Sequence, residues 1–257
     1  MCELFGVSAR RAVSLNRYLK EFFSHSVDHP NGWGLAFFHG NAASVEKEPL
    51  RATDSMYLRA RLRARIESRV MFAHIRKATK GHETYPNTHP FIGRDRTGRL
   101  WTLIHNGTVF ECGALDSYVR VQEGDTDSER ILLYLLNSMN AAEQGKGAPL
   151  EAEERFSVVA ACTEIIAPGN KVNYLLYDGE LLYAHANVPD GLHVLRRGEG
   201  AVFSTVPLSG EPFEAVPLNT VQAFREGELV FRAAPHPYVY TEDPEKMRLL
   251  FLEYAEL

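Results

Sequence analysis

The alternation of hydrophobic and polar positions along the chain predicts strands interspersed with a few amphipathic helices. Alternating or short apolar runs bounded by Gly, Asn, Asp and Pro are typical of strands, and apolar positions three and four residues apart are typical of helices. The expected strands cover residues 3–9, 33–39, 42–47, 70–76, 100–105, 172–177, 181–185, 192–196 and 201–205, with a hairpin around Glu226-Gly227. The expected helices begin at Ser14, at Thr53 or Asp54 (ending near Glu67), at Asp127 or Ser128, at Glu151 (ending near Ile166) and at Asp243. Helix-covered antiparallel sheets in a single α+β domain are the simplest architecture for this order of elements.

Two polar segments interrupt the pattern. Residues 78–99 are rich in Gly, Thr, Asn and Pro and join two expected strands. The segment is too long for a simple turn, so we expect it to line a site or to form a lid. Residues 142–149 predict a surface loop. There is neither an internal repeat nor a linker that separates two domains.

Composition and charge exclude several classes of partner. The chain has 257 residues, of which 45% are hydrophobic, enough to bury a sizeable core. A formal net charge of −5 argues against a nucleic-acid or anionic membrane surface. The arginines at 59, 61, 63 and 65 have no aromatic neighbours between them and predict a solvated helix face. No apolar run approaches the ~20 residues of a membrane span, and the chain does not begin like a signal peptide.

The cysteines and histidines predict no metal site. Cys2, Cys112 and Cys162 are too few and too scattered for a disulfide framework or a metal clip, so we expect a reducing, cytoplasmic location. The histidines at 74, 89 and 105 lack the short spacing of metal ligands. Neither a phosphate-binding loop nor a dinucleotide-binding glycine motif is present, so we expect no cofactor.

The position of Cys2 is the strongest indication of chemistry. It follows Met1 directly, and removal of Met1 would give one residue both a thiol and a free α-amine. A thiol with a pKa near ~8.5 is mostly protonated at neutral pH, whereas an α-amine near ~7.7 is partly neutral and can accept its proton. Cys2 would then be a nucleophile that carries its own base. A cysteine also occurs here by chance, so the motifs downstream decide between these interpretations.

Four further motifs follow Cys2 along the chain. They are Asn31-Gly32-Trp33-Gly34, residues 74–81 together with 87–90, His105-Asn106-Gly107, and residues 125–129. The whole set resembles the class II glutamine amidotransferases, and the opening and length are similar to the stand-alone bacterial branch. The resemblance implies an N-terminal-nucleophile hydrolase fold, which is a four-layer αββα sandwich of two antiparallel sheets. It also implies a single glutamine amidotransferase domain over residues 2–257.

The resemblance assigns the groups that would act on the amide. Cys2 is the nucleophile, and the Asn106 side-chain amide and the Gly107 backbone N–H form the oxyanion hole. Such preorganised donors stabilise the charge of a tetrahedral intermediate. An ordinary Asn-Gly turn at a strand end is the alternative interpretation of this pair.

The resemblance also assigns groups that would hold free glutamine. Arg76 grips the α-carboxylate through its planar guanidinium, and Asp127 accepts the α-ammonium. Alternatively, Thr126 or Asp127 simply caps the helix that begins there.

Further residues of the matched motifs are expected close to the substrate. Gly32 and Trp33 belong to the glycine loop beside the nucleophile, although Trp33 suits the core equally well. Thr79 and His89 would order the loop over the pocket. Lys77 departs from the pattern, since synthase-linked members often have tryptophan there, and this leaves the shape of the pocket open.

The expected activity is hydrolysis of the L-glutamine side-chain amide through a γ-glutamyl thioester on Cys2. The products are glutamate and ammonia, and a separate synthase subunit is a candidate partner that would use the ammonia. One alternative is hydrolysis of a γ-glutamyl amide in a larger metabolite or peptide. A second is a non-catalytic glutamine-binding protein.

Overall fold

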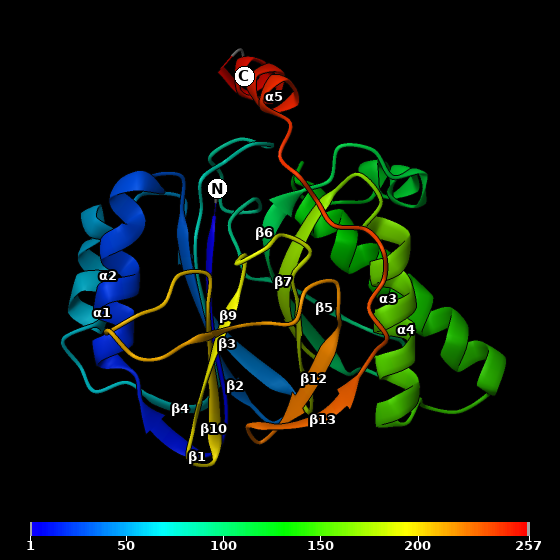
Figure 1. Cartoon of the computed structure of the whole chain (residues 1–257), viewed down its shortest axis with the longest axis horizontal. Coiled ribbons are helices and arrows are strands. Elements are labelled where there is room, and N and C mark those ends of the chain that lie inside the picture. The colour runs from blue at the N-terminus through cyan, green and yellow to red at the C-terminus, as the bar shows by residue number, and fades with distance from the viewer. Residues whose placement is uncertain (1, 256–257) are drawn as a thin grey trace.

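The fold is a sandwich of two antiparallel sheets with helices against both outer faces (Figure 1). The structure is a computed structural model that describes residues 2–255, with side chains as far as residue 250. The expected removal of Met1 therefore lies outside the described residues. The four layers confirm the α+β, αββα architecture implied by the sequence.

The first sheet combines strands from both halves of the chain. Its seven strands lie in the order β11-β9-β10-β1-β4-β2-β3. Their bounds are β1 Glu3–Ser14, β2 Trp33–His39, β3 Ala42–Glu48, β4 Glu67–Ile75, β9 His193–Arg197, β10 Gly200–Ser204 and β11 Glu214–Ala215. The central strand β1 pairs with β4 on one side and with β10 on the other. The first and last thirds of the chain thus share one sheet.

The second sheet holds the intervening strands and the closing hairpin. Its six strands lie in the order β13-β12-β8-β7-β6-β5. Their bounds are β5 Phe91–Arg94, β6 Leu100–Thr108, β7 Lys171–Tyr177, β8 Leu182–His185, β12 Gln222–Arg225 and β13 Glu228–Arg232. The hairpin between β12 and β13 turns at Glu226 and Gly227, both with positive φ, as the sequence predicts.

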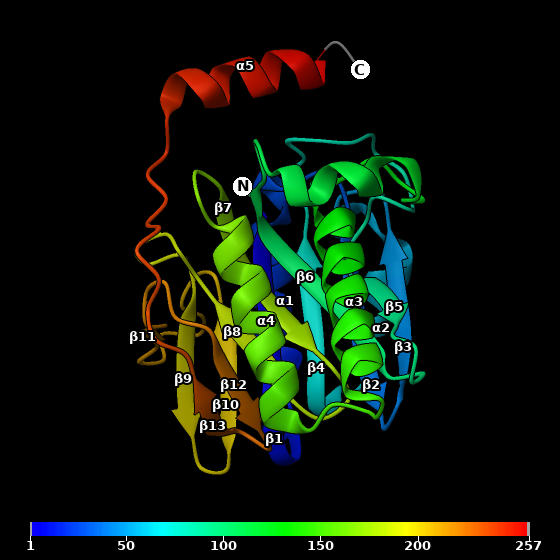
Figure 2. The same cartoon turned by 90° about the vertical axis from the view of Figure 1, so that its right-hand side faces the viewer.

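The helices cover the two outer faces and one end (Figure 2). Their bounds are α1 Asn16–Ser24 and α2 Met56–Arg61 on the first sheet, α3 Asp127–Lys146 and α4 Ala152–Ile166 on the second, and α5 Pro244–Ala255 across one end of the sandwich. The 3-10 helices are η1 His25–Asp28, η2 Ala52–Asp54 and η3 Gly113–Arg120. Within residues 2–255, no helix is long and apolar enough to cross a bilayer.

Strand alternation divides the buried side chains into three cores. On β1, Leu4 faces the layer between the sheets, where it joins Phe72, Ile104 and Leu175. The next residue, Phe5, faces the layer between the first sheet and its helices. A third core fills the space between the second sheet and α3 and α4. Because successive side chains of a strand point to opposite faces, a shift of β1 by one residue would exchange the environments of Leu4 and Phe5.

Several predicted boundaries are wrong for local reasons. The helix expected to begin at Thr53 or Asp54 instead begins after Ser55, whose hydroxyl accepts the Leu58 N–H at 2.9 Å, and it ends at Arg61. Ser14 is the last residue of β1 and does not cap α1.

Two expected loops contain regular structure. The segment at residues 78–99 includes the short edge strand β5. The predicted loop at residues 142–149 is largely helical, because α3 continues to Lys146 and ends at Gly147, which has the left-handed conformation that glycine favours.

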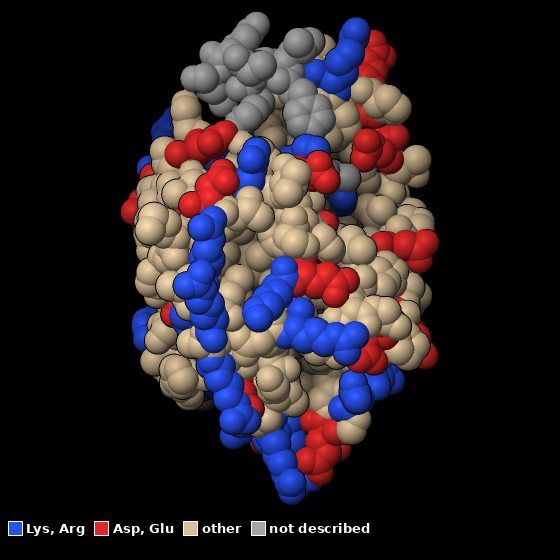
Figure 3. All heavy atoms as spheres, turned by 90° about the vertical axis from the view of Figure 1, so that its left-hand side faces the viewer, with Lys and Arg blue, Asp and Glu red and all other residues tan. Residues whose placement is uncertain are grey.

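Basic side chains cross the face of the molecule that carries α1 and α2, with acidic side chains among them (Figure 3). Arg61 of α2 pairs with Glu46 of β3 at 3.3 Å. The positive charge on this face is therefore partly compensated by neighbouring carboxylates.

Candidate active site

Cys2, Arg76 and Asn106, three of the predicted site residues, lie at one end of the layer between the two sheets. On β1 and β4, alternation places Cys2 with Leu4, and Arg76 with His74 and Phe72, on the face toward the second sheet. On β6, Asn106 shares its inward face with Ile104. The Nε2 atom of His74 lies 3.2 Å from the His105 carbonyl oxygen, which joins the two sheets here. Both cartoon views show α5 above this end (Figures 1 and 2).

Cys2 lies immediately before β1, with its thiol half-buried. The Lys77 N–H donates to the sulfur at 3.4 Å, and the Lys77 carbonyl oxygen lies 3.5 Å from it. Burial dominates and holds the pKa of the Cys2 thiol above its ordinary value, although the Lys77 N–H and the positive charges of Arg76 and Lys171 partly offset this shift. These three groups all favour the thiolate over the thiol.

Asn106 and Gly107 lie inside β6, so the Asn-Gly turn considered for this pair is wrong. The Asn106 side chain is only 2% exposed, and its amide oxygen has no hydrogen-bond partner among the described residues. A buried acceptor without a partner is costly, and this oxygen is available to a donor on a ligand or to a water molecule. A side chain at Gly107 would place a Cβ 2.0 Å from the Lys171 carbonyl oxygen, so the backbones approach too closely for any other residue.

Arg76 is also 2% exposed and holds the loop that follows β4. Its guanidinium donates to the carbonyl oxygens of Lys80 at 2.7 Å, Gly81 at 2.8 Å and His82 at 2.9 Å. The remaining guanidinium N–H groups have no hydrogen-bond partner among the described residues. Arg76 therefore orders residues 80–82 and keeps donors for a further acceptor.

Asp127 occupies the first turn of α3, and Thr126 is the capping residue. The Thr126 hydroxyl accepts the Glu129 N–H at 3.3 Å, which confirms the capping interpretation for this residue. The buried Asp127 carboxylate accepts the Val109 N–H at 2.6 Å. It thereby fixes the chain directly after β6, and the helix N-terminus favours its negative charge.

Thr79 and His89 connect the loop to the sheets. The Thr79 hydroxyl lies 3.0 Å from that of Thr108 at the end of β6. His89 is buried and stacks on His74 with ring centroids 4.0 Å apart, and neither of its ring nitrogens has a hydrogen-bond partner among the described residues.

The structure separates Gly32 from Trp33. The Gly32 carbonyl oxygen accepts the Arg76 N–H at 2.8 Å, and its φ of 141° is one that side chains disfavour. Trp33 points to the opposite face, where it is fully buried between Phe23 and Tyr57. Trp33 is therefore a core residue and does not line the site beside Cys2.

The histidines near Cys2 are held neutral by burial. Burial lowers the pKa of His74 to about 3, and that of His89 to well below its ordinary value. Burial also lowers the pKa of His105, although the charge of Asp127 opposes this shift. At neutral pH these imidazoles are uncharged and are weak proton acceptors.

One residue of this end was not among those predicted from the motifs. Lys171 is the first residue of β7 and is 5% exposed, and its charge and that of Cys2 act on each other. A single lysine at the start of a strand carries no motif. Its alternation with Asn173 along β7 is the one sequence signal that marks it as facing inward.

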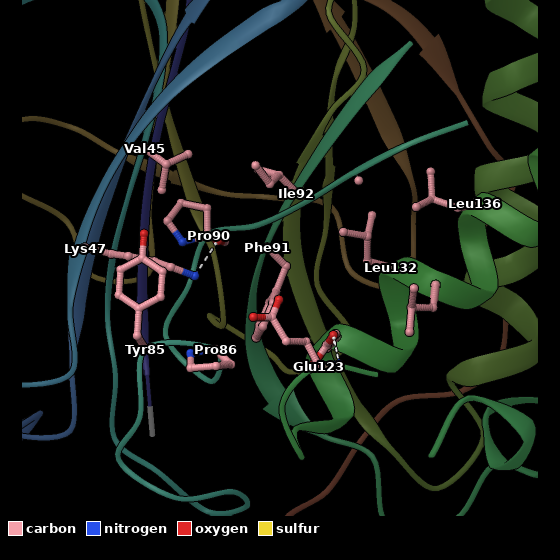
Figure 4. Close-up of a pocket in the computed structure, with 13 residues that line it drawn as sticks. Val45, Lys47, Tyr85, Pro86, Pro90, Phe91, Ile92, Glu123, Leu132 and Leu136 are labelled. Carbon is pink, nitrogen blue, oxygen red and sulfur yellow. Dashed lines mark hydrogen bonds between the residues drawn. The ribbon is translucent and has the colours of Figure 1, made fainter. Parts of the chain in front are cut away.

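A separate pocket of about 260 Å³ lies behind the loop, between β3 and α3 (Figure 4). Its lining includes Lys47, Tyr85, Phe91, Glu123 and Leu132. Neither Cys2 nor any other predicted catalytic residue lines this pocket, so it is distinct from the site described above.

Comparison with known proteins agrees with the motifs. Residues 1–200 match the family described as class-II glutamine amidotransferases. An uncharacterized protein of Methanocaldococcus jannaschii is 30% identical over an alignment of 260 residues, gaps included, that covers 90% of this chain and 71% of that protein. The protein named "Putative glutamine amidotransferase YafJ" of Escherichia coli is 29% identical over 200 residues, 77% of this chain and 76% of that protein.

The fold also matches solved structures. Glutamine phosphoribosylpyrophosphate amidotransferase from B. subtilis superposes with a TM-score of 0.67 at 15% identity, over 93% of this chain and 50% of that chain. At this identity the likeness concerns the fold alone. Because the family match spans most of the chain and carries the motifs described above, the chain belongs to the class II glutamine amidotransferases.

Proposed function

We propose that this protein hydrolyses the side-chain amide of L-glutamine through a γ-glutamyl thioester on Cys2. The observation that carries the proposal is the position of the Cys2 thiol, at the same end of the inter-sheet layer as Arg76 and Asn106. Its sulfur lies 3.4 Å from a backbone N–H that favours the thiolate. The family implies glutamine as the substrate.

The neutral histidines support the α-amine of Cys2 as the base. A group with a pKa of about 3, such as His74, accepts a proton from a thiol poorly at neutral pH. An α-amine titrates near ~7.7 and is much better matched to the task. Removal of Met1 is therefore part of the proposal.

The reaction would proceed in two halves. The amine takes the thiol proton, the sulfur attacks the amide carbon, and a carbon–sulfur bond forms. Asn106 and the Gly107 N–H stabilise the oxyanion, the amine protonates the leaving nitrogen, and the carbon–nitrogen bond breaks to release ammonia. Water then hydrolyses the thioester, which yields glutamate and restores the thiol.

Arg76 and Asp127 would hold the glutamine head group. The remaining guanidinium donors of Arg76 suit the α-carboxylate, and the Asp127 carboxylate suits the α-ammonium. Thr79, His89 and Gly32 would act through the loop and the backbone that they connect.

Three wider proposals accompany the reaction. Residues 2–257 act as a single domain, which is supported by the mixing of strands from both halves in each sheet. A separate synthase subunit receives the ammonia. The three free cysteines support a reducing compartment such as the cytoplasm.

The test compares substrates on protein whose N-terminus has been checked by mass. We expect ammonia release from L-glutamine, and its loss in Cys2→Ser. Faster release of amine from γ-glutamyl amides than of ammonia from glutamine would show that larger γ-glutamyl compounds are the preferred substrates. If protein that begins at Cys2 binds glutamine without turnover, the protein is a glutamine-binding protein and not an enzyme.

A further inference from the structure

Lys171 is a buried cation at the proposed site for which the motifs give no role. Its backbone opposes Thr108 in the pairing of β6 with β7. Its carbonyl oxygen lies 3.3 Å from Nε2 of His105 and directly under Gly107, which leaves no room for a side chain there. The first residue of β7 is thus held against the strand that carries Asn106 and Gly107.

The pairing also fixes the direction of the Lys171 side chain. Opposed residues of an antiparallel pair project from the same face of the sheet. Thr108 contacts Thr79, two residues beyond Lys77, and the Lys77 backbone contacts the Cys2 sulfur. The Lys171 side chain therefore projects on the face toward Cys2.

The electrostatics agree with this placement. Burial lowers the pKa of Lys171 to about 8, while the charges of Cys2 and Glu242 raise it. The positive charge of Lys171 in turn favours the Cys2 thiolate. The charge of Arg76 also favours the thiolate, and Nε2 of His105 lies beside the Lys171 carbonyl oxygen. Glu242 comes from the segment that leads into α5, the helix that lies over this end of the sandwich.

We propose that Lys171 is a positioning residue of this site, whose ammonium stabilises the thiolate of Cys2. The inference rests on the proposed function, because it gives Lys171 a role in preparing the nucleophile. It adds a charged group from β7 to the groups contributed by β1, β4 and β6.

The rate of Cys2 alkylation by iodoacetamide, followed by mass spectrometry across pH, tests the proposal. In Lys171→Met we expect the midpoint of the profile to move up by about 1 pH unit, as for loss of a nearby opposite charge. Lys171→Arg keeps the charge and should restore a midpoint near that of the wild type. A midpoint that does not move in Lys171→Met would overturn the proposal.

Lys47→Met is the matched control. Burial also lowers the pKa of Lys47 to about 8, but Lys47 lines the pocket beside α3, where Glu123 and Glu129 act on it. Its loss should leave the Cys2 midpoint unchanged. An equal shift in this control would show a general effect of removing a buried lysine, and would also overturn the proposal.

A reciprocal measurement avoids any change at Lys171. In protein with ε-¹³C-labelled lysine, Cys2→Ser should lower the NMR titration midpoint of Lys171, because the thiolate that raises it is gone. An unchanged midpoint would contradict the proposal even if Lys171→Met failed to fold. Both measurements need no turnover, so absence of ammonia release would refute the proposed function while leaving these results to decide the role of Lys171.

Discussion

The middle and the end of the inter-sheet layer differ in chemistry, although the same strands form both. In the middle, Leu4, Phe72, Ile104 and Leu175 form a closed apolar core. Two or four residues further along each strand, the same inward faces carry polar side chains, namely Cys2, His74, Arg76, Asn106 and Lys171. Alternation decides which side chains point inward, and residue type then decides whether the position stabilises the fold or is free to do chemistry.

The polar end retains a cost that the apolar middle avoids. Buried polar atoms without hydrogen-bond partners among the described residues include Nδ1 of His74, both ring nitrogens of His89 and the amide oxygen of Asn106. Each such group normally costs about 1–3 kcal/mol. At the polar end these atoms leave hydrogen-bonding capacity for a ligand, although other such atoms, for example Thr102 Oγ1 and Gln222 Oε1, lie elsewhere in the described chain.

Truncation in the apolar middle should have the largest effect on folding. Leu175 is fully buried, and its Cδ1 lies where a side chain at Gly6 of β1 would be. We expect Leu175→Ala to lower the free energy of unfolding by about 2–5 kcal/mol, measured by urea denaturation. The partly exposed Leu229 of β13 provides the control, and Leu229→Ala should cost much less. Equal losses in the two variants would mean that the inter-sheet core is not tightly packed.

Truncation at the polar end should instead reduce turnover. We expect Asn106→Ala to lower kcat for glutamine by about 10²- to 10³-fold, because a donor to the oxyanion is lost. Its urea midpoint should change little, since the amide oxygen stabilises no other described group. The control Asn140→Ala, on the surface of α3, should leave kcat unaltered. An Asn106→Ala enzyme with normal kcat would remove this residue from the site.

Replacement of the arginine should have a smaller effect, mainly on substrate binding. We expect Arg76→Lys to raise KM for glutamine by more than about tenfold, because an ammonium cannot bind both the loop carbonyls and a carboxylate in the same geometry. Arg94→Lys on the exposed edge strand β5 is the control. If KM in Arg76→Lys equals that of the wild type, the arginine serves only to order residues 80–82.

Much of the fold could be predicted from the sequence where local signals are strong. The hairpin of β2 and β3 and the turn at Glu226-Gly227 follow from alternation and turn residues. The end of α2 at Arg61 does not follow from these signals. The strand conformation of Asn106-Gly107 does not either, because pairing of β6 with β7 overrides the turn preference of Asn-Gly.

The candidate site shows the same division. The motifs carry Cys2, Arg76 and Asn106, which the fold brings to one end. Lys171 has no motif and becomes visible only through its register with Thr108. Trp33 lies within a matched motif, yet alternation turns it to the outer core. Sequence motifs thus identify Cys2, Arg76 and Asn106 more readily than a residue such as Lys171, whose position depends on the pairing of distant strands.

The central claim is that Cys2, exposed as the N-terminal residue, forms a covalent bond with the glutamine side chain. A glutamine analogue with an electrophilic carbon in place of the side-chain amide, followed by intact-mass and peptide analysis, tests this most directly. We predict a single adduct on Cys2, which excess L-glutamine prevents and which protein retaining Met1 does not form. An adduct on Cys112 or Cys162, or labelling of Cys2 that glutamine does not affect, would contradict the account.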